Sequence, residues 1–279
     1  MPKSPKTIYQ SGRTLEQLKN HYEVEKSLAK KLLNAPKEAR KKIVLTMYDE
    51  LFEKVPDHPR LTRREDPEST EAYIKDKYRL IGKHLNSSVV FLDFAPGDCK
   101  FAYDVCKRVN YVYGIDISDQ RAAQDRPPAN FKHIIYDGYS VDIGENTIDV
   151  AFSDQLLEHL HPDDMKDHLK LALRVLRPWG IYLFRTPHNY SGPHDISGYF
   201  SDIPEGFHLK EWTFTEFFQL MKTLPFSSFS GCLMMKGRRI VLPYYVLMVY
   251  EYLLALLPKK FRKALCTRIL CEVIIIAKK

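Results

Sequence analysis

The sequence has few cysteines, and none lie in the patterns that indicate a disulfide framework or a zinc site. They number five and no two are spaced as CxxC: Cys99, Cys106, Cys232, Cys266 and Cys271. This usage favours reduced thiols and therefore a cytoplasmic protein. The opening residues, MPKSPKTIYQSGRT, lack the apolar stretch that a signal peptide requires, so no secretion signal is expected.

No apolar run is long enough to span a membrane as a helix. The most apolar segment, VLPYYVLMVYEYLLALL at 241–257, is shorter than the roughly 20 residues that a span needs, and Pro243 and Glu251 interrupt it. Because a helix that is apolar on all sides is usually buried, we expect a core or lid helix within an insertion at about 240–265. The basic stretch PKKFRK at 258–263 keeps a second interpretation open, peripheral membrane contact through 241–263.

The excess of basic residues is modest. The chain has 42 Lys and Arg residues against 35 Asp and Glu, a net charge of +7, and the basic residues are interleaved with acids along the sequence. This pattern indicates a generally basic solvated surface rather than a nucleic-acid-binding strip. No NPPY-like tetrapeptide, which could hold a flipped base, is present. We therefore expect no nucleic-acid partner.

The first third of the chain is rich in helical signals. Apolar residues recur near helical spacing over 14–35 and 36–55, with Pro36 at a helix start. A polar, proline-rich connector, PDHPRLTRREDPES, then precedes a third helix at about 69–85. We therefore expect residues 1–85 to form an N-terminal helical extension or lid.

From residue 89 the apolar pattern changes to short runs of strand length. They are VVFLDF, YVYGIDI, FKHIIY, IDVAFS, GIYLFRT and, at the end of the sequence, CEVIIIAKK. Helical stretches at about 99–109 and 163–176 separate them, and this alternation predicts a parallel sheet with helices on both faces. We expect the last run to pair with one near 226–235 as an edge hairpin, within a second domain at 86–279.

The stretch FLDFAPGDCKFAYDVCKRVNYVYGIDIS at 91–118 has the layout of a nucleotide-binding corner, yet its loop holds one glycine, Gly97, where such loops often hold three. Asp93 and Asp116 lie 23 residues apart, the spacing of one strand–helix–strand unit. An acid at the tip of the second strand can accept both hydroxyls of a ribose. The carboxylates of Asp93 and Asp98 would repel a pyrophosphate, but they would suit a ligand with an ammonium and a sulfonium group. An NAD-dependent oxidoreductase is therefore the weaker alternative.

In these residues the sequence resembles the class I S-adenosylmethionine-dependent methyltransferases, especially the bacterial small-molecule type of unassigned substrate. The resemblance covers roughly 89–221 in five ordered blocks: FLDFAPGDC, GIDIS, YDG at 136–138, TIDVAFSDQLLEHL and LRVLRPWGIYLF. It implies a Rossmann-like methyltransferase fold, an α/β fold with a mostly parallel seven-stranded sheet, an antiparallel last strand and helices on both faces. It also implies that S-adenosylmethionine is the cofactor and that these residues contact it: Asp93, Ala95, Gly97, Asp116, Ile117, Asp137, Gly138, Asp154 and Gln155.

The expected chemistry is simple, because a methyl group on a sulfonium is already activated and the protein mainly aligns the acceptor and excludes water. A base is needed only for a hydroxyl or a protonated amine, and histidine is the usual choice. Three histidines that follow the fourth and fifth strands are the candidates: His159, His188 and His194. Metal ligation by His188, His194, Asp195 and His208 matches no metal motif, so no metal is predicted.

These inferences predict an enzyme that methylates an oxygen or carbon atom of a small molecule. The apolar insertion suggests a hydrophobic acceptor, and we expect the N-terminal helices and the 240–265 insertion to close over it. Two other interpretations stay open. The altered loop is compatible with a scaffold or partner subunit that has the cofactor fold without activity, and the net charge with a nucleic-acid methyltransferase.

Overall fold

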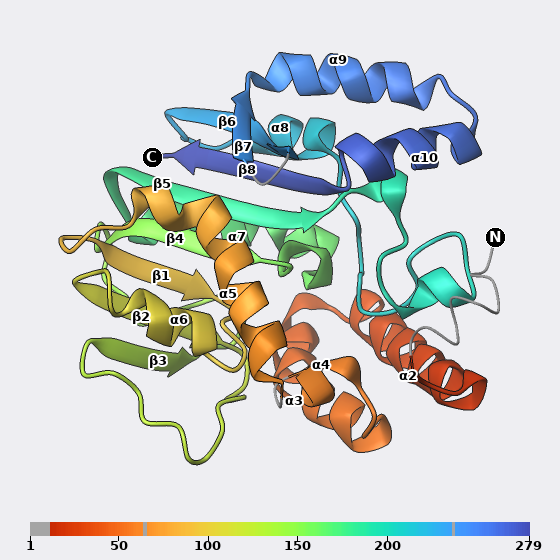
Figure 1. The fold of residues 1–279 in the computed structure, drawn as a ribbon, viewed down its shortest axis with the longest axis horizontal. Coiled ribbons are helices and arrows are strands. Elements are labelled where there is room, and N and C mark those ends of the chain that lie inside the picture. Colours follow the sequence, from red (N-terminus) through yellow and green to blue (C-terminus); the bar gives the residue numbers. More distant parts are fainter. Residues whose placement is uncertain (1–11, 64–65, 236–237) are drawn as a thin grey trace.

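An eight-stranded sheet forms the centre of the molecule (Figure 1) in a computed structural model that describes residues 12–63, 66–235 and 238–279. The strand order is β3-β2-β1-β4-β5-β8-β6-β7, in which β1 to β5 are parallel and β8, β6 and β7 are antiparallel to their neighbours. The strands are β1 Val90–Phe94, β2 Tyr111–Asp116, β3 Phe131–Ile135, β4 Ile148–Asp154, β5 Leu176–Pro187, β6 Ser228–Met235, β7 Arg238–Leu242 and β8 Glu272–Lys278. The α-helices are α2 Leu15–Leu33, α3 Lys37–Lys54, α4 Pro59–Arg63, α5 Pro67–Ile81, α6 Lys100–Val105, α7 Met165–Val175, α8 Phe214–Met221, α9 Tyr244–Ala255 and α10 Lys259–Ile269. Short 3₁₀ turns are η1 Gly82–His84, η2 Leu157–His159, η3 Pro162–Asp164, η4 Asn189–Ser191 and η5 Ile196–Tyr199.

The predicted fold class is confirmed, and the predicted strand count is one short. The first three residues of the expected 240–265 insertion, together with the two preceding arginines, pair with β6 as the edge strand β7. The pairing of the last strand with the run near 226–235 is confirmed, but β8 is not part of an edge hairpin. It lies between β5 and β6, with Ile275 opposite both Phe184 and Gly231.

Helices cover both faces of the sheet, as the alternating pattern predicts. On β1, Leu92 and Phe94 pack in the core shared with α7 and α8, whereas Phe91 packs in the core shared with α5 and α6. Successive side chains of a strand point to opposite faces, so a strand covered on both sides must be apolar almost throughout. This explains why the central strands appear in the sequence as continuous apolar runs.

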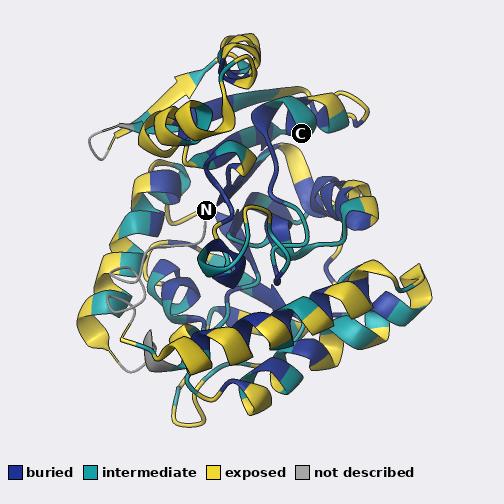
Figure 2. Cartoon of the chain, turned by 90° about the vertical axis from the view of Figure 1, so that its right-hand side faces the viewer, coloured by how far each residue is buried: buried dark blue, intermediate teal, exposed yellow. Residues whose placement is uncertain are grey.

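The N-terminal helices lie near the carboxyl ends of the parallel strands (Figure 1). Helix α2 begins with a capping box in which the Thr14 side chain accepts from the Gln17 backbone and the Gln17 side chain accepts from the Thr14 backbone. Leu28 and Leu32 of α2 pack with α3 and with Phe207, which belongs to the long loop after β5. Figure 2 shows these helices with one face buried and the other exposed. The predicted helical extension at 1–85 thus contains α2 to α5, and its role as a lid stays a prediction; residues 1–11 and 64–65 lie outside the described part.

The apolar segment at 241–257 does not form the buried or lid helix that its sequence predicts. Helix α9 turns Leu247, Glu251 and Leu254 inward, while its outer side chains, among them Tyr252 and Leu256, are exposed. No helix among the described residues is both long and apolar enough to cross a membrane. The outer face of α9 therefore remains open at the surface.

Candidate functional site

Two neighbouring cavities lie at the carboxyl ends of the parallel strands. The first is walled by the loop after β1, the end of β2, the turn after β3 and the end of β4. Seven of the nine predicted cofactor residues line it, as does His159: Ala95, Gly97, Asp116, Ile117, Gly138, Asp154 and Gln155. Asp93 and Asp137 are not among its lining residues. The sheet edge thus gathers segments far apart in the sequence, as expected for a parallel α/β fold.

The loop after β1 keeps a glycine-type backbone with only one glycine. Ala95, Gly97 and Cys99 have φ values of 56°, 61° and 61°, all in the left-handed region. A Cβ added at Gly97 would meet no atom within 4 Å, so this position presents bare backbone to open space. For Ala95 and Cys99 the left-handed conformation costs roughly 1–2 kcal/mol each. Strain of this kind persists where the surrounding structure imposes it, typically at ligand sites.

Asp116 stands at the tip of β2 and organises the loop. One carboxylate oxygen accepts from the Gly97 amide at 3.0 Å and the other from the Ile117 amide at 2.8 Å. Burial raises the pKa of Asp116, and these two amide bonds oppose that rise. Each carboxylate oxygen has a second lone pair, so the side chain can still accept hydroxyl hydrogens from a ligand.

Asp93 is the penultimate residue of β1 and is fully buried beneath the loop. Neither of its carboxylate oxygens has a hydrogen-bond partner among the described residues. Burial raises its pKa to about 7; the Lys77 ammonium lowers the pKa, whereas Asp154 and Asp116 raise it further. Lys77 is itself buried, and its pKa lies above the ordinary value because Tyr73, Asp93 and Asp154 outweigh the effect of burial. The floor of the site is therefore a buried negative charge with one internal counter-ion.

Two predicted cofactor residues have internal partners. Both carboxylate oxygens of Asp154 accept from Arg185, at 2.6 and 2.9 Å, so its side chain is held by β5. Asp137 caps its own turn, accepting from the amides of Tyr139 and Ser140 at 2.9 and 2.8 Å. Asp-Gly favours turns, and the turn that Asp137 forms places the adjacent Gly138, at φ 84°, on the cavity wall.

The second cavity adjoins the first and is rich in histidine. Tyr48, Arg60, Gln155 and His159 line both. The second cavity is further lined by seven groups able to bind protons or metals: His21, Glu25, His58, Glu158, His194, Asp195 and His208. Two of the three predicted catalytic histidines, His159 and His194, are thus brought to this cavity.

The third candidate, His188, is elsewhere. Its ring is fully buried, and Nε2 donates to Glu251 of α9 at 2.8 Å, while Nδ1 accepts from the Tyr190 amide at 3.1 Å. It lines neither cavity. The sequence prediction for His188 is wrong because the chain turns after β5 and directs this ring under α9. None of the residues of the 240–265 insertion lines either cavity, so the structure gives no support to its predicted closure over the acceptor.

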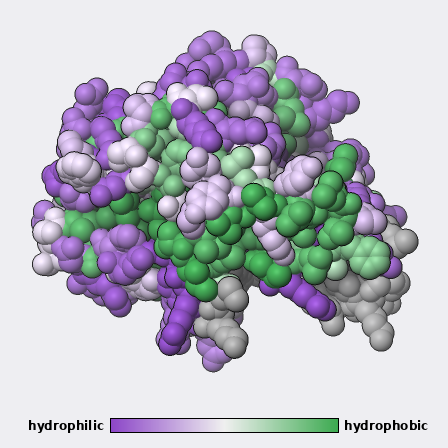
Figure 3. Space-filling view, turned by 90° about the horizontal axis from the view of Figure 1, so that it is seen from above, coloured by the Kyte–Doolittle hydropathy of each residue, from purple (hydrophilic) through white to green (hydrophobic). Residues whose placement is uncertain are grey.

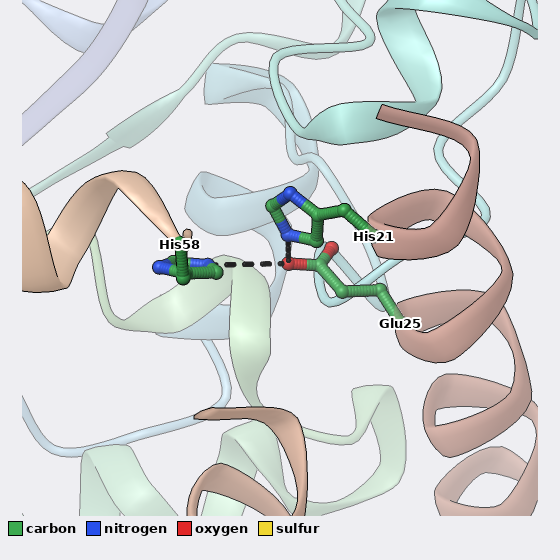
Figure 4. A group of neighbouring side chains, drawn as sticks. All are labelled: His21, Glu25 and His58. Carbon is green, nitrogen blue, oxygen red and sulfur yellow. Dashed lines mark hydrogen bonds and ion pairs between the residues drawn. The ribbon is translucent and has the colours of Figure 1, made fainter. Parts of the chain in front are cut away.

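His21, Glu25 and His58 have the composition of a metal site, but their hydrogen bonds exclude this role (Figure 4). His21 Nδ1 lies 2.9 Å from Arg13 Nη1, which can only donate, and His58 Nδ1 accepts from the Arg60 amide at 3.1 Å. Both neutral rings must therefore carry their proton on Nε2, which points at Glu25 Oε1, at 2.7 and 3.8 Å. Burial would raise the pKa of Glu25, but bonds from both histidines hold it below its ordinary value.

The first cavity also has a wall from the N-terminal helices, whose individual residues the sequence analysis did not single out. The N-terminal helices contribute Arg40, Val44, Met47, Tyr48 and Arg60. Arg40 also forms an ion pair with Asp164 at 2.7 Å, which fixes α3 against the methyltransferase-like half of the chain. The expected N-terminal lid indicated this region in general, but Arg60 lies in PDHPRLTRR, which composition indicates to be a polar connector.

Comparison with known proteins agrees with this geometry. Residues 92–184 match a family model described as a methyltransferase domain. The fold is similar to Haemonchus contortus phosphoethanolamine N-methyltransferase 1, solved with phosphoethanolamine and S-adenosylhomocysteine (14% identity, TM-score 0.59, 88% of this chain and 50% of that one). It is also similar to Burkholderia thailandensis 1,6-didemethyltoxoflavin-N1-methyltransferase, solved with 1,6-didemethyltoxoflavin and S-adenosylhomocysteine (16% identity, TM-score 0.55, 88% of this chain and 91% of that one). A third similar structure is an Archaeoglobus fulgidus SAM-dependent methyltransferase (16% identity, TM-score 0.51, 75% of this chain and 94% of that one).

The comparisons show the fold and one matched domain. The chain spans half the length of the Haemonchus contortus protein, and no curated protein sequence matches it. Residues 92–184, a third of the chain, match the methyltransferase domain model, and the structural neighbours share a fold of the class I type. Both findings agree with the family that the sequence resembles.

Proposed function

We propose that the protein transfers the methyl group of S-adenosylmethionine to an oxygen or carbon atom of a small, hydrophobic acceptor. The observation that carries this proposal is the contact between the two cavities. Gln155 and His159 line both, so a donor in the first and an acceptor in the second would meet at these residues. Positioning of this kind is the main contribution that an enzyme makes to methyl transfer.

The residues of the first cavity fit the donor. Asp116 has free lone pairs for ribose hydroxyls, and Gly97 presents bare backbone beside it. The unpartnered carboxylate of Asp93, below the loop, supplies the negative potential that favours a cation. S-adenosylmethionine supplies a methyl group that its sulfonium charge activates. We assign Ile117, Asp137 and Gly138 to the adenine side, and Ala95, Asp154 and Gln155 to the methionine side.

The second cavity supplies the acceptor contacts. Phe207, Ile196 and Tyr199 give it apolar walls, and the N-terminal helices separate it from water on one side. His159 donates from Nδ1 to the Phe207 carbonyl at 2.8 Å, which fixes its ring and leaves the Nε2 lone pair for the acceptor. We assign His159 to the reacting group of the acceptor and His194 to a supporting contact.

Titration calorimetry with S-adenosylhomocysteine tests the donor site. We expect saturable binding by the wild-type chain, and Asp116→Asn should weaken it about 10- to 100-fold, the effect of losing a hydrogen bond to a charged group. Asp119→Asn is the matched control, because Asp119 pairs with Arg121 and lines neither cavity. Absence of any heat would favour the scaffold interpretation, and binding of NADH instead would favour an oxidoreductase.

The acceptor is tested separately, with a labelled methyl donor and a panel of hydrophobic phenols, acids and amines. We expect transfer to phenols or acids of this panel, none to the amines, and none to RNA or DNA at any salt concentration. Labelling of nucleic acid in place of small molecules would overturn the acceptor proposal.

A further inference from the structure

Three groups of the second cavity converge without a hydrogen-bond donor between them. Glu158 and His159 belong to the η2 turn after β4, and His208 comes from the long loop after β5. Each offers one ligand atom, and the three atoms lie within 4.8 Å of one another among the described residues. The two imidazole rings meet edge to face, with centroids 5.1 Å apart.

The protons of both rings are fixed by their outer partners. His159 Nδ1 lies 2.8 Å from the Phe207 carbonyl, which can only accept, so this nitrogen carries the hydrogen. His208 Nδ1 lies 2.8 Å from the Glu211 carboxylate and donates in the same way. In the neutral rings both Nε2 atoms therefore hold a lone pair, and neither has a hydrogen-bond partner among the described residues.

Glu158 adds a third hydrogen-bond acceptor that has no donor among the described residues. Its side chain is fully buried; Oε2 accepts from the Thr186 hydroxyl at 2.8 Å, and Oε1 has no partner among the described residues. With Glu158 ionised and both rings neutral, a carboxylate oxygen and two imidazole lone pairs cannot satisfy one another. One metal cation at the centre can satisfy all three at once.

The arrangement is the opposite of that at His21, Glu25 and His58. There the outer partners of the rings are donors, so Nε2–H bonds fill the centre of the group. Here the outer partners are a carbonyl and a carboxylate, the partners that orient metal-binding histidines in proteins. Of the two groups, only the second therefore presents lone pairs to its centre.

We propose that Glu158, His159 and His208 bind one divalent transition-metal ion of the zinc or iron(II) type. Two imidazoles and one carboxylate suit such ions, leave coordination positions open and disfavour Mg²⁺ and Ca²⁺, which prefer oxygen ligands. The ion would occupy the Nε2 lone pair of His159, so His159 would act on the acceptor through the ion and not directly. The open positions face the cavity that also touches the first one, so the ion would coordinate the oxygen of the acceptor and favour its deprotonated form. This use of the ion rests on the proposed function, whereas binding of the ion does not.

The test is a Co²⁺ and Zn²⁺ titration of chelator-treated protein that carries no histidine tag. The background is Cys271→Ser, because Cys271 is an exposed thiol that could bind these ions alone. We expect one ion per chain, visible for Co²⁺ in its visible absorption bands, and a raised melting temperature with Zn²⁺. Glu158→Gln and His208→Gln should each lower the affinity by more than about 100-fold. Glu211→Gln should lower it by about 10- to 100-fold, because the His208 ring loses the carboxylate that orients it.

His21→Gln is the matched control and should leave the stoichiometry and the affinity unchanged. Unchanged melting curves without ion in the variants would show that they fold. The proposal is overturned if no ion saturates the wild-type chain, or if binding survives Glu158→Gln but is lost in His21→Gln. Binding without any effect on methyl transfer would keep the site and remove only its catalytic use.

A second, independent observation concerns the surface of α9 and α10. Figure 3 shows apolar side chains gathered over the face of the molecule that carries α9. Exposed members on the two helices include Val249, Tyr252, Leu253, Leu256, Phe261 and Leu265. Such a patch is unusual for a soluble monomer and marks a contact with another apolar phase or molecule.

The same segment carries most of the excess positive charge. Residues 238–269 contain seven Lys and Arg residues and one acid, Glu251, in a chain whose net charge is +7. Glu251 is buried and points inward, accepting from the amides of Phe214 and Thr215 at 2.6 and 2.8 Å. The outer surface of this segment is thus apolar and purely basic, and the even scatter of charge expected from the sequence is wrong here.

We infer that α9 and α10 dock on an anionic lipid surface. Apolar side chains at a helix face with lysine and arginine beside them match the interface of a membrane that contains acidic lipids. Lys263 Nζ donates to the Gly192 carbonyl at 2.8 Å, and Lys259 lies 3.8 Å from Asp202, so the docked helices hold the loop that walls the second cavity. This placement would bring a membrane-dissolved acceptor close to the site.

Flotation with vesicles tests this inference. We expect the protein to float with phosphatidylglycerol–phosphatidylcholine vesicles, to bind pure phosphatidylcholine at least tenfold more weakly and to detach at high salt. Leu256→Glu with Phe261→Glu should abolish flotation, while Trp179→Glu, which removes an equally exposed aromatic ring on β5, should not. Flotation unaffected by the double substitution, or a dimer in sedimentation that the substitution dissolves without any vesicle binding, would overturn it.

Discussion

The substitution Asp93→Asn tests the buried charge beneath the cofactor loop. The carboxylate is fully buried and unpartnered, and its pKa is raised from the ordinary 3.8 to about 7. At 1.36 kcal/mol for each unit of pKa, keeping Asp93 ionised in the folded chain costs roughly 4 kcal/mol. A cationic ligand above the loop would recover part of this free energy.

The sign of the effect on stability follows from linkage. A carboxyl group whose folded pKa is raised contributes most below its unfolded pKa, and its contribution is lost as the pH rises through the folded value. The contribution of Asp93 to the wild-type free energy of unfolding should therefore fall by up to roughly 4 kcal/mol between about pH 4 and pH 7. In Asp93→Asn this part of the pH dependence should vanish, because the amide is neutral at every pH.

Ligand binding should change in the opposite direction. The wild-type affinity for S-adenosylmethionine should rise with pH up to about 7 to 8, and binding at pH 7 should release about half a proton, since half of the carboxyl groups are then protonated. Calorimetry in two buffers of different ionisation enthalpy measures this release. Asp93→Asn should bind more weakly and release none. Equal affinity and equal proton release in the two proteins would refute the reasoning.

Three further expectations concern the loop and the α9 attachment, each measured by urea unfolding. Ala95→Gly should stabilise the chain by about 0.5–1 kcal/mol, because Ala95 occupies the left-handed region. Gly114→Ala should destabilise the chain, because its Cβ would meet the Phe131 ring at 3.0 Å and Pro96 at 3.2 Å. A loss of stability in Ala95→Gly would contradict the strain argument. Glu251→Gln should cost roughly 3 kcal/mol, since a buried charged acceptor loses its bonds. A cost below that of an ordinary helix cap, about 1 kcal/mol, would show that this acid does not anchor α9.

Much of the fold could be predicted from the sequence, because strand and helix periods are local properties of the chain. The runs VVFLDF and YVYGIDI became β1 and β2, and the helical stretch at 163–176 became α7. Seven of nine predicted cofactor residues line the first cavity for a related reason: the ends of neighbouring parallel strands must meet at one edge. The predicted contacts themselves await the binding measurements.

The errors of the sequence analysis have a common physical cause, which is contacts between residues that lie far apart in the sequence. His188 and His159 have equal standing in the sequence, but one donates to Glu251 under α9 and the other to Phe207 beside the cavity. The apolar composition of α9 predicts burial, yet the sheet below has room for only one of its faces, which Leu247 and Glu251 occupy.

The sequence by itself determined the succession of strands and helices along the chain and the acids at two strand ends, since these depend on spacing along the chain. The expected class of protein came from the resemblance to a known family. The tertiary structure decided which face of α9 is exposed and where the protons of the histidines lie. Those properties depend on groups that only folding brings together, a carbonyl or carboxylate beside one pair of rings and an arginine or amide beside another.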